Sequence, residues 1–165
     1  MPVVYLGLGS NKGHRLQNIE VALDHLKEKI AVEKISSFYL TEPVGMKGGW
    51  FVNCVLEGKT EQSPEKLLHT LLEVEKRMGR IREKKKTSRV IDLDLLLYED
   101  VIVDKIDFVV PHPHLHKRRF VLIPLVEINP HLIHPGMGKS LKEILKELKD
   151  SHQVDKILEN KYGGH

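Results

Sequence analysis

The sequence predicts an α+β domain in which helices pack on an antiparallel sheet. Short segments rich in aliphatic and aromatic side chains recur along the N-terminal part of the chain, and segments with apolar residues at helical spacing separate them. The resulting order is strand, helix, strand, strand, helix, strand. This is the order of the ferredoxin-like split βαβ arrangement, which hosts many unrelated functions. The pattern therefore predicts the architecture, and the activity has to be argued from individual residues.

Length and composition indicate one globular domain. The chain has 165 residues, of which 41% are hydrophobic, enough for a single core without a linker. We therefore expect residues 1–165 to form one domain, with Gly163 to His165 frayed. The 26 basic and 23 acidic residues nearly balance, which argues against a general polyanion binder. A single Cys54 and the lack of a leader-like or membrane-length apolar segment predict a cytoplasmic protein without membrane association.

The N-terminal half begins with a predicted strand over residues 3–8. We interpret the glycines of the following Gly7-Leu8-Gly9-Ser10-Asn11 as turn formers, because the third glycine of a dinucleotide fingerprint is missing. A helix should follow, since apolar residues from Leu16 to Leu26 recur at helical spacing. Three further segments are a second strand over 30–40, a Gly- and Pro-rich loop over 41–49 and a third strand over 50–57.

The C-terminal half begins with a clear helix signal. Ser63 is a favourable N-cap, Pro64 suits the first turn, and Gly79 is a natural terminator. The remaining expected elements are an apolar strand over 89–97, a short strand over 101–103 that pairs with it, a helix over 121–128 and a last helix capped by Ser140.

Two carboxylates lie inside the apolar run Arg89-Val90-Ile91-Asp92-Leu93-Asp94-Leu95-Leu96-Leu97. Side chains alternate along a strand, so Asp92 and Asp94 should point to the same face, roughly 6 to 7 Å apart. Charge in an apolar setting is costly unless a metal ion, a cationic side chain or a shared proton neutralises it. Metal binding is the favoured interpretation, and pairing with neighbouring Arg or Lys residues is the alternative.

A basic segment precedes these carboxylates. Between Lys76 and Arg89 only Glu83 opposes a run of Lys and Arg residues, and the part from Arg80 onward should be an exposed loop. Carboxylates bind hard cations, whereas Arg forks and Lys charges bind phosphate oxygens. Together the two clusters match a magnesium-bound polyphosphate, although a basic run by itself is more typical of a solvated helix face or a nucleic-acid patch.

Two other segments carry candidate binding residues. Phe51 and Asn53 share one face of the third strand, where an aromatic beside an amide suits a flat polar ring; a half-exposed strand is the alternative. The segment from Pro111 to Phe120 holds three histidines, but their spacing is not that of zinc sites and no Cys lies near. A His and an Arg facing phosphate is the favoured interpretation.

These motifs, in this order, resemble the 2-amino-4-hydroxy-6-hydroxymethyldihydropteridine pyrophosphokinase family of folate biosynthesis. The resemblance runs from about residue 3 to residue 140, and several motifs in one order are far more specific than any one of them. It rests on Gly7–Asn11, Ser37–Gly45, Phe51–Asn53, Arg89 with Asp92-Leu93-Asp94, and Pro111-His112-Pro113 through Arg118 and Phe120.

The resemblance implies transfer of the diphosphoryl group of ATP to the hydroxymethyl oxygen of a reduced pterin, leaving AMP. The partners would be these small molecules, with no nucleic acid and no membrane. The implied catalytic residues are Arg80, Arg89, Asp92 and Asp94, the two aspartates holding two Mg²⁺ ions. ATP contacts would come from Arg80, Arg82, Arg89, His112 and Arg118 at the phosphates, with Leu95 and Phe108 flanking adenine. The pterin would sit against Thr41, Pro43, Val44, Phe51, Asn53 and Phe120.

The chain departs from the family pattern at a few positions. Thr87 and Ser88 precede the signature arginine where a small residue and Pro are usual, and the Trp often found in that loop is absent. Phe51 stands where Tyr is frequent, and Asp107 where some members have Arg. Two other classes share parts of this pattern. An RNA-binding module would match the basic loop, but with only 5% aromatic residues the chain has few side chains for base stacking, and a two-metal nucleotidyltransferase could use the same Asp pair but would release pyrophosphate.

Overall fold

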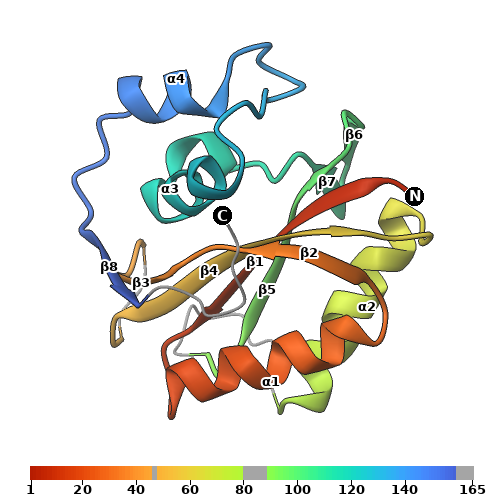
Figure 1. The fold of residues 1–165 in the computed structure, drawn as a ribbon, viewed down its shortest axis with the longest axis vertical. Coiled ribbons are helices and arrows are strands. Elements are labelled where there is room, and N and C mark those ends of the chain that lie inside the picture. Colours follow the sequence, from red (N-terminus) through yellow and green to blue (C-terminus); the bar gives the residue numbers. More distant parts are fainter. Residues whose placement is uncertain (46–47, 80–88, 159–165) are drawn as a thin grey trace.

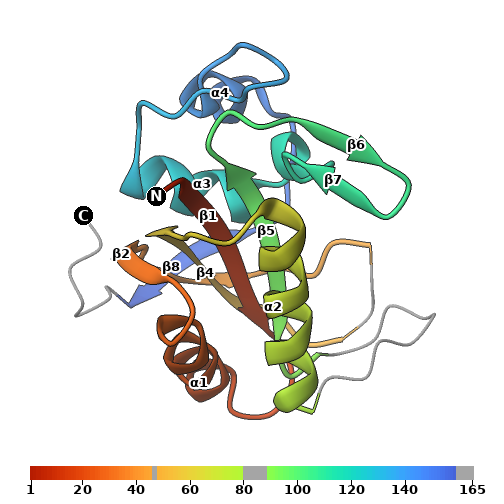
Figure 2. The same cartoon turned by 90° about the vertical axis from the view of Figure 1, so that its right-hand side faces the viewer.

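A computed structural model describes residues 1–45, 48–79 and 89–158 of the chain. Helices cover both faces of a central sheet: α1 and α2 lie on one side, and α3 and α4 on the other (Figure 1; Figure 2). None of the described helices has the length and apolarity that crossing a membrane requires. The elements in chain order are β1 (Val3–Ser10), α1 (Arg15–Lys27), β2 (Ala31–Ile35), β3 (Phe38–Thr41), β4 (Phe51–Lys59), α2 (Pro64–Arg77), β5 (Asp92–Tyr98), β6 (Val103–Lys105), β7 (Phe108–Val110), a 3-10 turn (Leu115–Lys117), α3 (Arg119–Ile128), α4 (Leu141–Glu147) and β8 (Val154–Leu158).

The main sheet contains the antiparallel split βαβ arrangement that the sequence predicted. Within the described residues the strands are ordered β5-β1-β4-β3-β8. Strand β2 also pairs with β4, on the same edge as β3 but at the other end of that strand. Every pairing in this sheet is antiparallel. Because β1 lies between the third and fourth strands of the split βαβ order, the predicted α+β fold class is confirmed.

Each face of the sheet carries its own apolar core. One core joins the sheet to α1 and α2 and includes Leu8 and Leu67. The other joins it to α3 and α4 and includes Leu96, Leu122 and Leu141. The sequence predicted α3 and α4 as helices without placing them. They form the third layer of the domain, so the central strands are sandwiched between two helical layers.

The first strand is longer than the sequence predicted. β1 continues through Gly7 and Gly9 to Ser10 and pairs with both β4 and β5 along this stretch. The interpretation of these glycines as turn formers is therefore wrong. Glycine weakens an isolated strand, but pairing on both edges overrides that local preference.

The predicted second strand over residues 30–40 is two strands separated by Ser36 and Ser37. The Ser36 hydroxyl oxygen accepts the Val55 N–H at 2.9 Å, a bond that a backbone carbonyl would otherwise make. The Ser37 N–H instead donates to Glu127 of α3 at 3.1 Å. Side chains thus satisfy the backbone where the ladder is interrupted, which allows the bend between β2 and β3.

Two pairings differ from the prediction. Residues 101–103 do not form a strand paired with β5; β6 starts at Val103 and pairs with β7 in a separate two-stranded sheet. Near the end of the described chain, β8 pairs with β3 and supplies an edge strand that the sequence did not predict. The expected fraying of Gly163 to His165 lies outside the described residues.

The helix start signals are confirmed. The Ser63 hydroxyl accepts the Lys66 N–H at 3.2 Å at the start of α2, and the Ser140 hydroxyl accepts the Glu143 N–H at 3.1 Å at the start of α4. Each serine satisfies one of the N–H groups that the first helical turn leaves without an intrahelical partner.

Ser63→Ala should lower the free energy of unfolding by about 1 kcal/mol, because it removes this acceptor from the first turn of α2. Urea denaturation measures the change. Ser63→Asp keeps an acceptor at the cap and should stay within about 0.5 kcal/mol of the wild type. Equal stability of the wild type and Ser63→Ala would contradict a stabilising cap.

Candidate active site

A hollow opens on the sheet face that carries α3. It contains about 730 Å³ of empty space, a volume that includes the open solvent at its mouth. Strands β1, β3, β4 and β5, the loop after β3 and the start of α3 all contribute to it. Its lining includes Gly7, Gly9, Thr41, Glu42, Val44, Phe51, Asn53, Arg89, Asp92, Asp94, Leu96, Arg118 and Phe120.

The floor of the hollow is made by the glycines of β1. Gly9 pairs with Asn53 of β4 on one side and with Asp92 of β5 on the other, and Gly7 pairs with Asp94. A Cβ atom at Gly9 would overlap the side-chain oxygen of Asn53. Because neither glycine has a side chain, β1 leaves open space between the carboxylates of β5 and the amide of β4.

The two aspartates face the hollow and are partly exposed, with 22% of the Asp92 side chain and 31% of the Asp94 side chain accessible. Asp92 Oδ2 pairs with Arg89 Nη1 at 3.1 Å. No group of three or more His, Cys, Asp or Glu side chains in the described parts of the chain is arranged to hold a metal. A divalent cation at this pair would therefore take its remaining oxygens from water or a bound molecule, as Mg²⁺ commonly does.

His112 stands beside Asp94 in a fixed orientation. The His112 backbone N–H donates to the Leu96 carbonyl at 3.0 Å, and the ring Nδ1 accepts the His114 backbone N–H at 3.1 Å. The neutral ring therefore carries its proton on Nε2, which lies 3.8 Å from Asp94 Oδ1. Burial, followed by the positive charges of Arg118 and His114, lowers the pKa of His112 to about 4. The ring is thus a neutral donor near neutral pH.

Asn53 is held against the opposite wall. Its Nδ2 donates to Thr41 Oγ1 of β3 at 2.6 Å, and its oxygen lies over Gly9. Phe51, two residues earlier on β4, faces the same side and lines the hollow. An aromatic face and an amide edge therefore adjoin, as the sequence predicted for these two residues.

Asn11 ties two loops to the end of β1. Its N–H donates to the Arg89 carbonyl at 3.0 Å, and its Oδ1 accepts the Arg89 N–H at 2.6 Å. Its Nδ2 donates to the Gly49 carbonyl at 3.1 Å. Asn11 thus fixes the backbone of Arg89, whose guanidinium pairs with Asp92, relative to the loop that leads into β4.

Arg118 and Phe120 form the roof at the start of α3. The Arg118 guanidinium carbon lies 5.5 Å from the centroid of the Phe120 ring, within the range of a cation–π contact. Stacking on the ring orients the guanidinium, which lines the same hollow as the aspartates.

Comparison with known proteins decides the family. The model of the family described as 7,8-dihydro-6-hydroxymethylpterin-pyrophosphokinase (HPPK) matches residues 5–130. The chain belongs to the HPPK family. Among its relatives, the 2-amino-4-hydroxy-6-hydroxymethyldihydropteridine pyrophosphokinase of Aquifex aeolicus is 45% identical over 148 residues, covering 89% of this chain and 92% of that protein. The Bacillus subtilis protein of the same name is 40% identical over 129 residues, covering 76% and 77%.

Longer proteins also contain an HPPK-like part. The folic acid synthesis protein fol1 of Schizosaccharomyces pombe is 40% identical over 88% of this chain, which spans 20% of that protein. A crystal structure of Plasmodium falciparum HPPK-DHPS superposes with a TM-score of 0.72 at 14% identity, covering 88% of this chain and 45% of the other. That likeness shows the shared fold.

The structure brings most of the residues implied by the HPPK resemblance to this one hollow. Thr41, Val44, Phe51, Asn53, Arg89, Asp92, Asp94, Arg118 and Phe120 line it, and His112 adjoins it through Asp94. Pro43 is not among the lining residues, although its neighbours Glu42 and Val44 are. Arg80 and Arg82 lie outside the described residues, as does most of the basic loop. Sequence reasoning did not single out Glu42 or the bridging role of Asn11.

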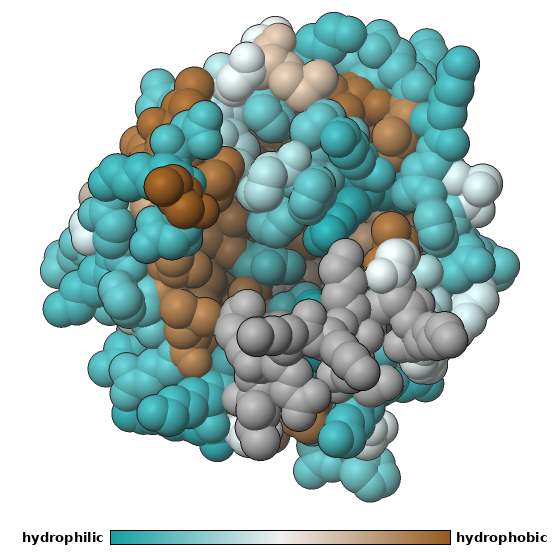
Figure 3. All heavy atoms as spheres, turned by 180° about the vertical axis from the view of Figure 1, so that it is seen from behind, coloured by the Kyte–Doolittle hydropathy of each residue, from teal (hydrophilic) through white to brown (hydrophobic). Residues whose placement is uncertain are grey.

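Leu95 and Phe108 are not part of the hollow. Their side chains are 5% and 7% exposed and belong to the core beneath α1 and α2. Apolar side chains also gather at the surface on the side of the molecule where α2 and the β6–β7 hairpin lie (Figure 3). Leu72, Ile102 and Ile106 are exposed on these elements or next to them. The two residues expected to flank adenine are therefore separated from the aspartates by the sheet itself.

Gly9→Ala should lower the free energy of unfolding by about 1 to 3 kcal/mol, since the added methyl overlaps the Asn53 oxygen and forces it to move. The Asn53 side-chain amide signal in an NMR spectrum should shift with it. Gly7→Ala is the matched control, because its Cβ would lie 3.5 Å from the nearest Leu96 atom, an ordinary contact. If both variants were equally stable and left the Asn53 signal in place, the steric role of Gly9 would be refuted.

Proposed function

We propose that this chain transfers the diphosphoryl group of ATP to the hydroxymethyl oxygen of 6-hydroxymethyl-7,8-dihydropterin, giving AMP and the pterin diphosphate. The observation that carries the proposal is that Asp92 and Asn53 face one hollow from the two strands flanking Gly9. Adjacent strands lie about 4.8 Å apart, so these positions are separated by roughly 10 Å. A phosphate chain at one wall and a flat ring at the other would meet over the glycine floor.

The pterin is assigned to the wall formed by Thr41, Val44, Phe51, Asn53 and Phe120, with Pro43 in the backbone segment beside them. A pterin ring has flat faces and an edge of alternating hydrogen-bond donors and acceptors. The aromatic side chains suit the faces, and the Asn53 amide suits the edge. The Thr41–Asn53 hydrogen bond fixes which way that amide points before the ligand arrives.

The triphosphate is assigned to the wall formed by Asp92, Asp94, Arg89, His112 and Arg118. Two partly exposed carboxylates with no third acidic, His or Cys ligand grouped with them among the described residues suit Mg²⁺ that is shared with substrate phosphates, and we propose two such ions. Bound magnesium would neutralise phosphate charge and polarise the transferring group. Arg80 and Arg82, outside the described residues, are proposed from the sequence as further phosphate contacts.

Adenine is proposed to lie on the far side of β5, near Leu95 and Phe108. Strand β5 is the edge of the main sheet, so a nucleotide can pass around it from the aspartates to the side that carries α2. The exposed apolar surface there supports the assignment (Figure 3).

The reaction needs positioning and charge stabilisation more than covalent catalysis by the protein. A bond forms between the hydroxymethyl oxygen and the β-phosphorus, the bridge from the β-phosphorus to the α-phosphate oxygen breaks, and the hydroxyl proton is released. Arg89 and Arg118 stabilise negative charge on the phosphates, and neutral His112 can donate from Nε2 without adding charge. The glycine floor lets the two reactants approach each other.

One incubation tests the reaction. The protein is mixed with magnesium, ATP and the reduced pterin alcohol, and the nucleotide product is identified by chromatography. AMP formed only in the presence of the pterin is the expected result. ADP, or free pyrophosphate, would refute the proposed diphosphoryl transfer, and pyrophosphate would point instead to a nucleotidyltransferase.

Asp92→Asn and Asp94→Asn should each reduce kcat on the order of a hundredfold or more, because each removes a carboxylate charge from the proposed metal site while nearly preserving volume. Steady-state rates at saturating magnesium and ATP measure this. Asp104→Asn, an exposed position on β6, is the matched control and should keep wild-type activity. Rates within a few-fold of the wild type in both site variants would eliminate the metal assignment.

Asn53→Ala should weaken pterin binding about tenfold and change ATP binding less than twofold, because it leaves part of the ring edge without a hydrogen-bond partner. Separate titrations with each ligand test the difference. Asn129→Ala is the control. Asn129 lies at the end of α3, is not a lining residue, and donates through its side-chain amide to the Tyr5 hydroxyl. Its loss should leave both affinities unchanged. An equal loss of both ligands in Asn53→Ala would make Asn53 a purely structural residue.

A further inference from the structure

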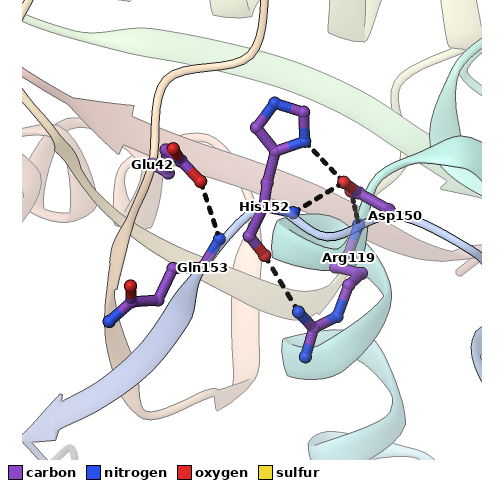
Figure 4. A network of polar contacts seen from close by, with 5 residues as sticks. All are labelled: Glu42, Arg119, Asp150, His152 and Gln153. Carbon is purple, nitrogen blue, oxygen red and sulfur yellow. Dashed lines mark hydrogen bonds and ion pairs between the residues drawn. The ribbon is translucent and has the colours of Figure 1, made fainter.

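The segment from Asp150 to Leu158, here termed the C-terminal strap, runs along two walls of the hollow. Its second half is β8, which pairs with β3 from Phe38 to Thr41. Its first half crosses from β3 to the start of α3 and makes the polar contacts drawn in Figure 4. The HPPK family match ends at residue 130, so the strap lies beyond it.

The strap holds the pterin wall through Glu42. The Glu42 N–H donates to the Gln153 carbonyl at 3.0 Å, and the Gln153 N–H donates back to Glu42 Oε1 at 3.0 Å. Glu42 lies between Thr41, which orients Asn53, and the lining residue Val44. A shift of the strap would therefore reach the amide assigned to the pterin edge through a short chain of contacts.

The strap holds the roof of the hollow through Arg119. The Arg119 guanidinium donates to the His152 carbonyl at 2.9 Å, and the Arg119 backbone N–H donates to Asp150 Oδ2 at 3.4 Å. Asp150 Oδ1 in turn accepts the His152 N–H at 2.9 Å, which bends the strap toward α3. Arg119 stands between Arg118 and Phe120, whose side chains line the hollow. Arg119 itself is not a lining residue, and its side chain points toward the strap at His152 (Figure 4).

The other support of the pterin wall is short. β3 pairs with β4 only over Tyr39, Leu40 and Thr41. The wall residues that follow, Glu42 to Val44, lie beyond this ladder, in the loop that leads back to β4. Ser37, just before β3, and Tyr39 of β3 also donate to Glu127 of α3. Hydrogen bonds from the strap add to these contacts and extend the tie to Glu42, beyond the ladder.

We propose that the C-terminal strap positions the pterin-binding walls, with Arg119 and Asp150 as positioning residues that never touch substrate. The inference rests on the proposed function, since it assigns Thr41, Asn53 and Phe120 to the pterin. Loosening the strap frees both walls and lowers pterin affinity. ATP contacts on β5 and at His112 are not held by the strap and keep their geometry, whereas Arg118 adjoins Arg119 in the roof. Nucleotide affinity therefore falls less than pterin affinity.

The test compares single substitutions in the full chain with two truncations. Arg119→Ala removes the guanidinium bond to the His152 carbonyl. Asp150→Ala removes the acceptor of the Arg119 and His152 backbone N–H groups, and the double variant removes both sets of contacts. One truncation ends at residue 158 and keeps the strap, whereas the other ends at residue 149 and removes it. Lys139→Ala, which breaks an exposed ion pair to Glu147 on α4, is the control for losing a surface charge contact.

Each protein is titrated with 6-hydroxymethylpterin, followed by pterin fluorescence, and with α,β-methylene-ATP in magnesium. Arg119→Ala and Asp150→Ala should raise the pterin Kd by a factor on the order of five to ten, as expected for one lost hydrogen bond to a charged group. The double variant should be little worse than either single variant, because both act through one segment. The pterin KM should rise likewise and kcat should stay within twofold, while the nucleotide Kd should rise by a smaller factor than the pterin Kd.

The outcomes separate this proposal from the proposed function. If the wild type binds no pterin, the proposed function fails. If the wild type binds pterin and both single variants bind it as tightly as the wild type does, the strap proposal is overturned. Equal losses of pterin and nucleotide affinity in the variants would overturn it too. Loss of pterin affinity on ending the chain at residue 158 would also overturn it. Circular dichroism confirms that each variant is folded, and the single substitutions decide the question if the chain ending at residue 149 does not fold.

Discussion

The site depends on a steric constraint in the middle of the sheet: the second half of β1 must be apolar on one face and bare on the other. Leu6 and Leu8 of β1 pack into the core with α1 and α2. Gly7 and Gly9 leave the opposite face without side chains, beyond the point where Tyr5 packs in the core with α3 and α4. β1 is held on both edges by β4 and β5, so it can lack side chains on one face and remain a strand. The free volume of the hollow is thus obtained without opening the core.

The charged side chains around the hollow are arranged so that their partial burial is not costly when no ligand is bound. A carboxylate left unpaired in a partly buried site would be costly, and Arg89 relieves that cost for Asp92. His112 adjoins Asp94 as a neutral ring, because burial lowers its pKa. A bound polyphosphate with its cations would therefore exchange partners within an existing set of charges, which limits the reorganisation that binding demands.

The sequence was sufficient to predict those features that depend on interactions between residues close together in the chain. The caps at Ser63 and Ser140 depend on residues three positions away, and the shared face of Asp92 and Asp94 follows from strand alternation. The glycines of β1 were misinterpreted because their role is set by Asn53 and Asp92, far away in the chain. The three hydrogen bonds of Asn11 are equally non-local. Strand β8 escaped prediction because Val154 to Leu158 is short and interrupted by charged residues, so it becomes a strand through its pairing with β3.

The pairing of β8 with β3 also has a consequence for how the protein is made. Its partners are more than a hundred residues apart in the chain, as Thr41 and Val154 show, and such long-range pairing is slow because loop closure precedes any gain from contact. On the ribosome, the strands that carry the glycine floor, the aspartates and Asn53 all emerge before β8 is synthesised. A nascent chain can thus build its core and the charged side of the hollow first, while the wall around Glu42 acquires its final shape only after β8 has been synthesised.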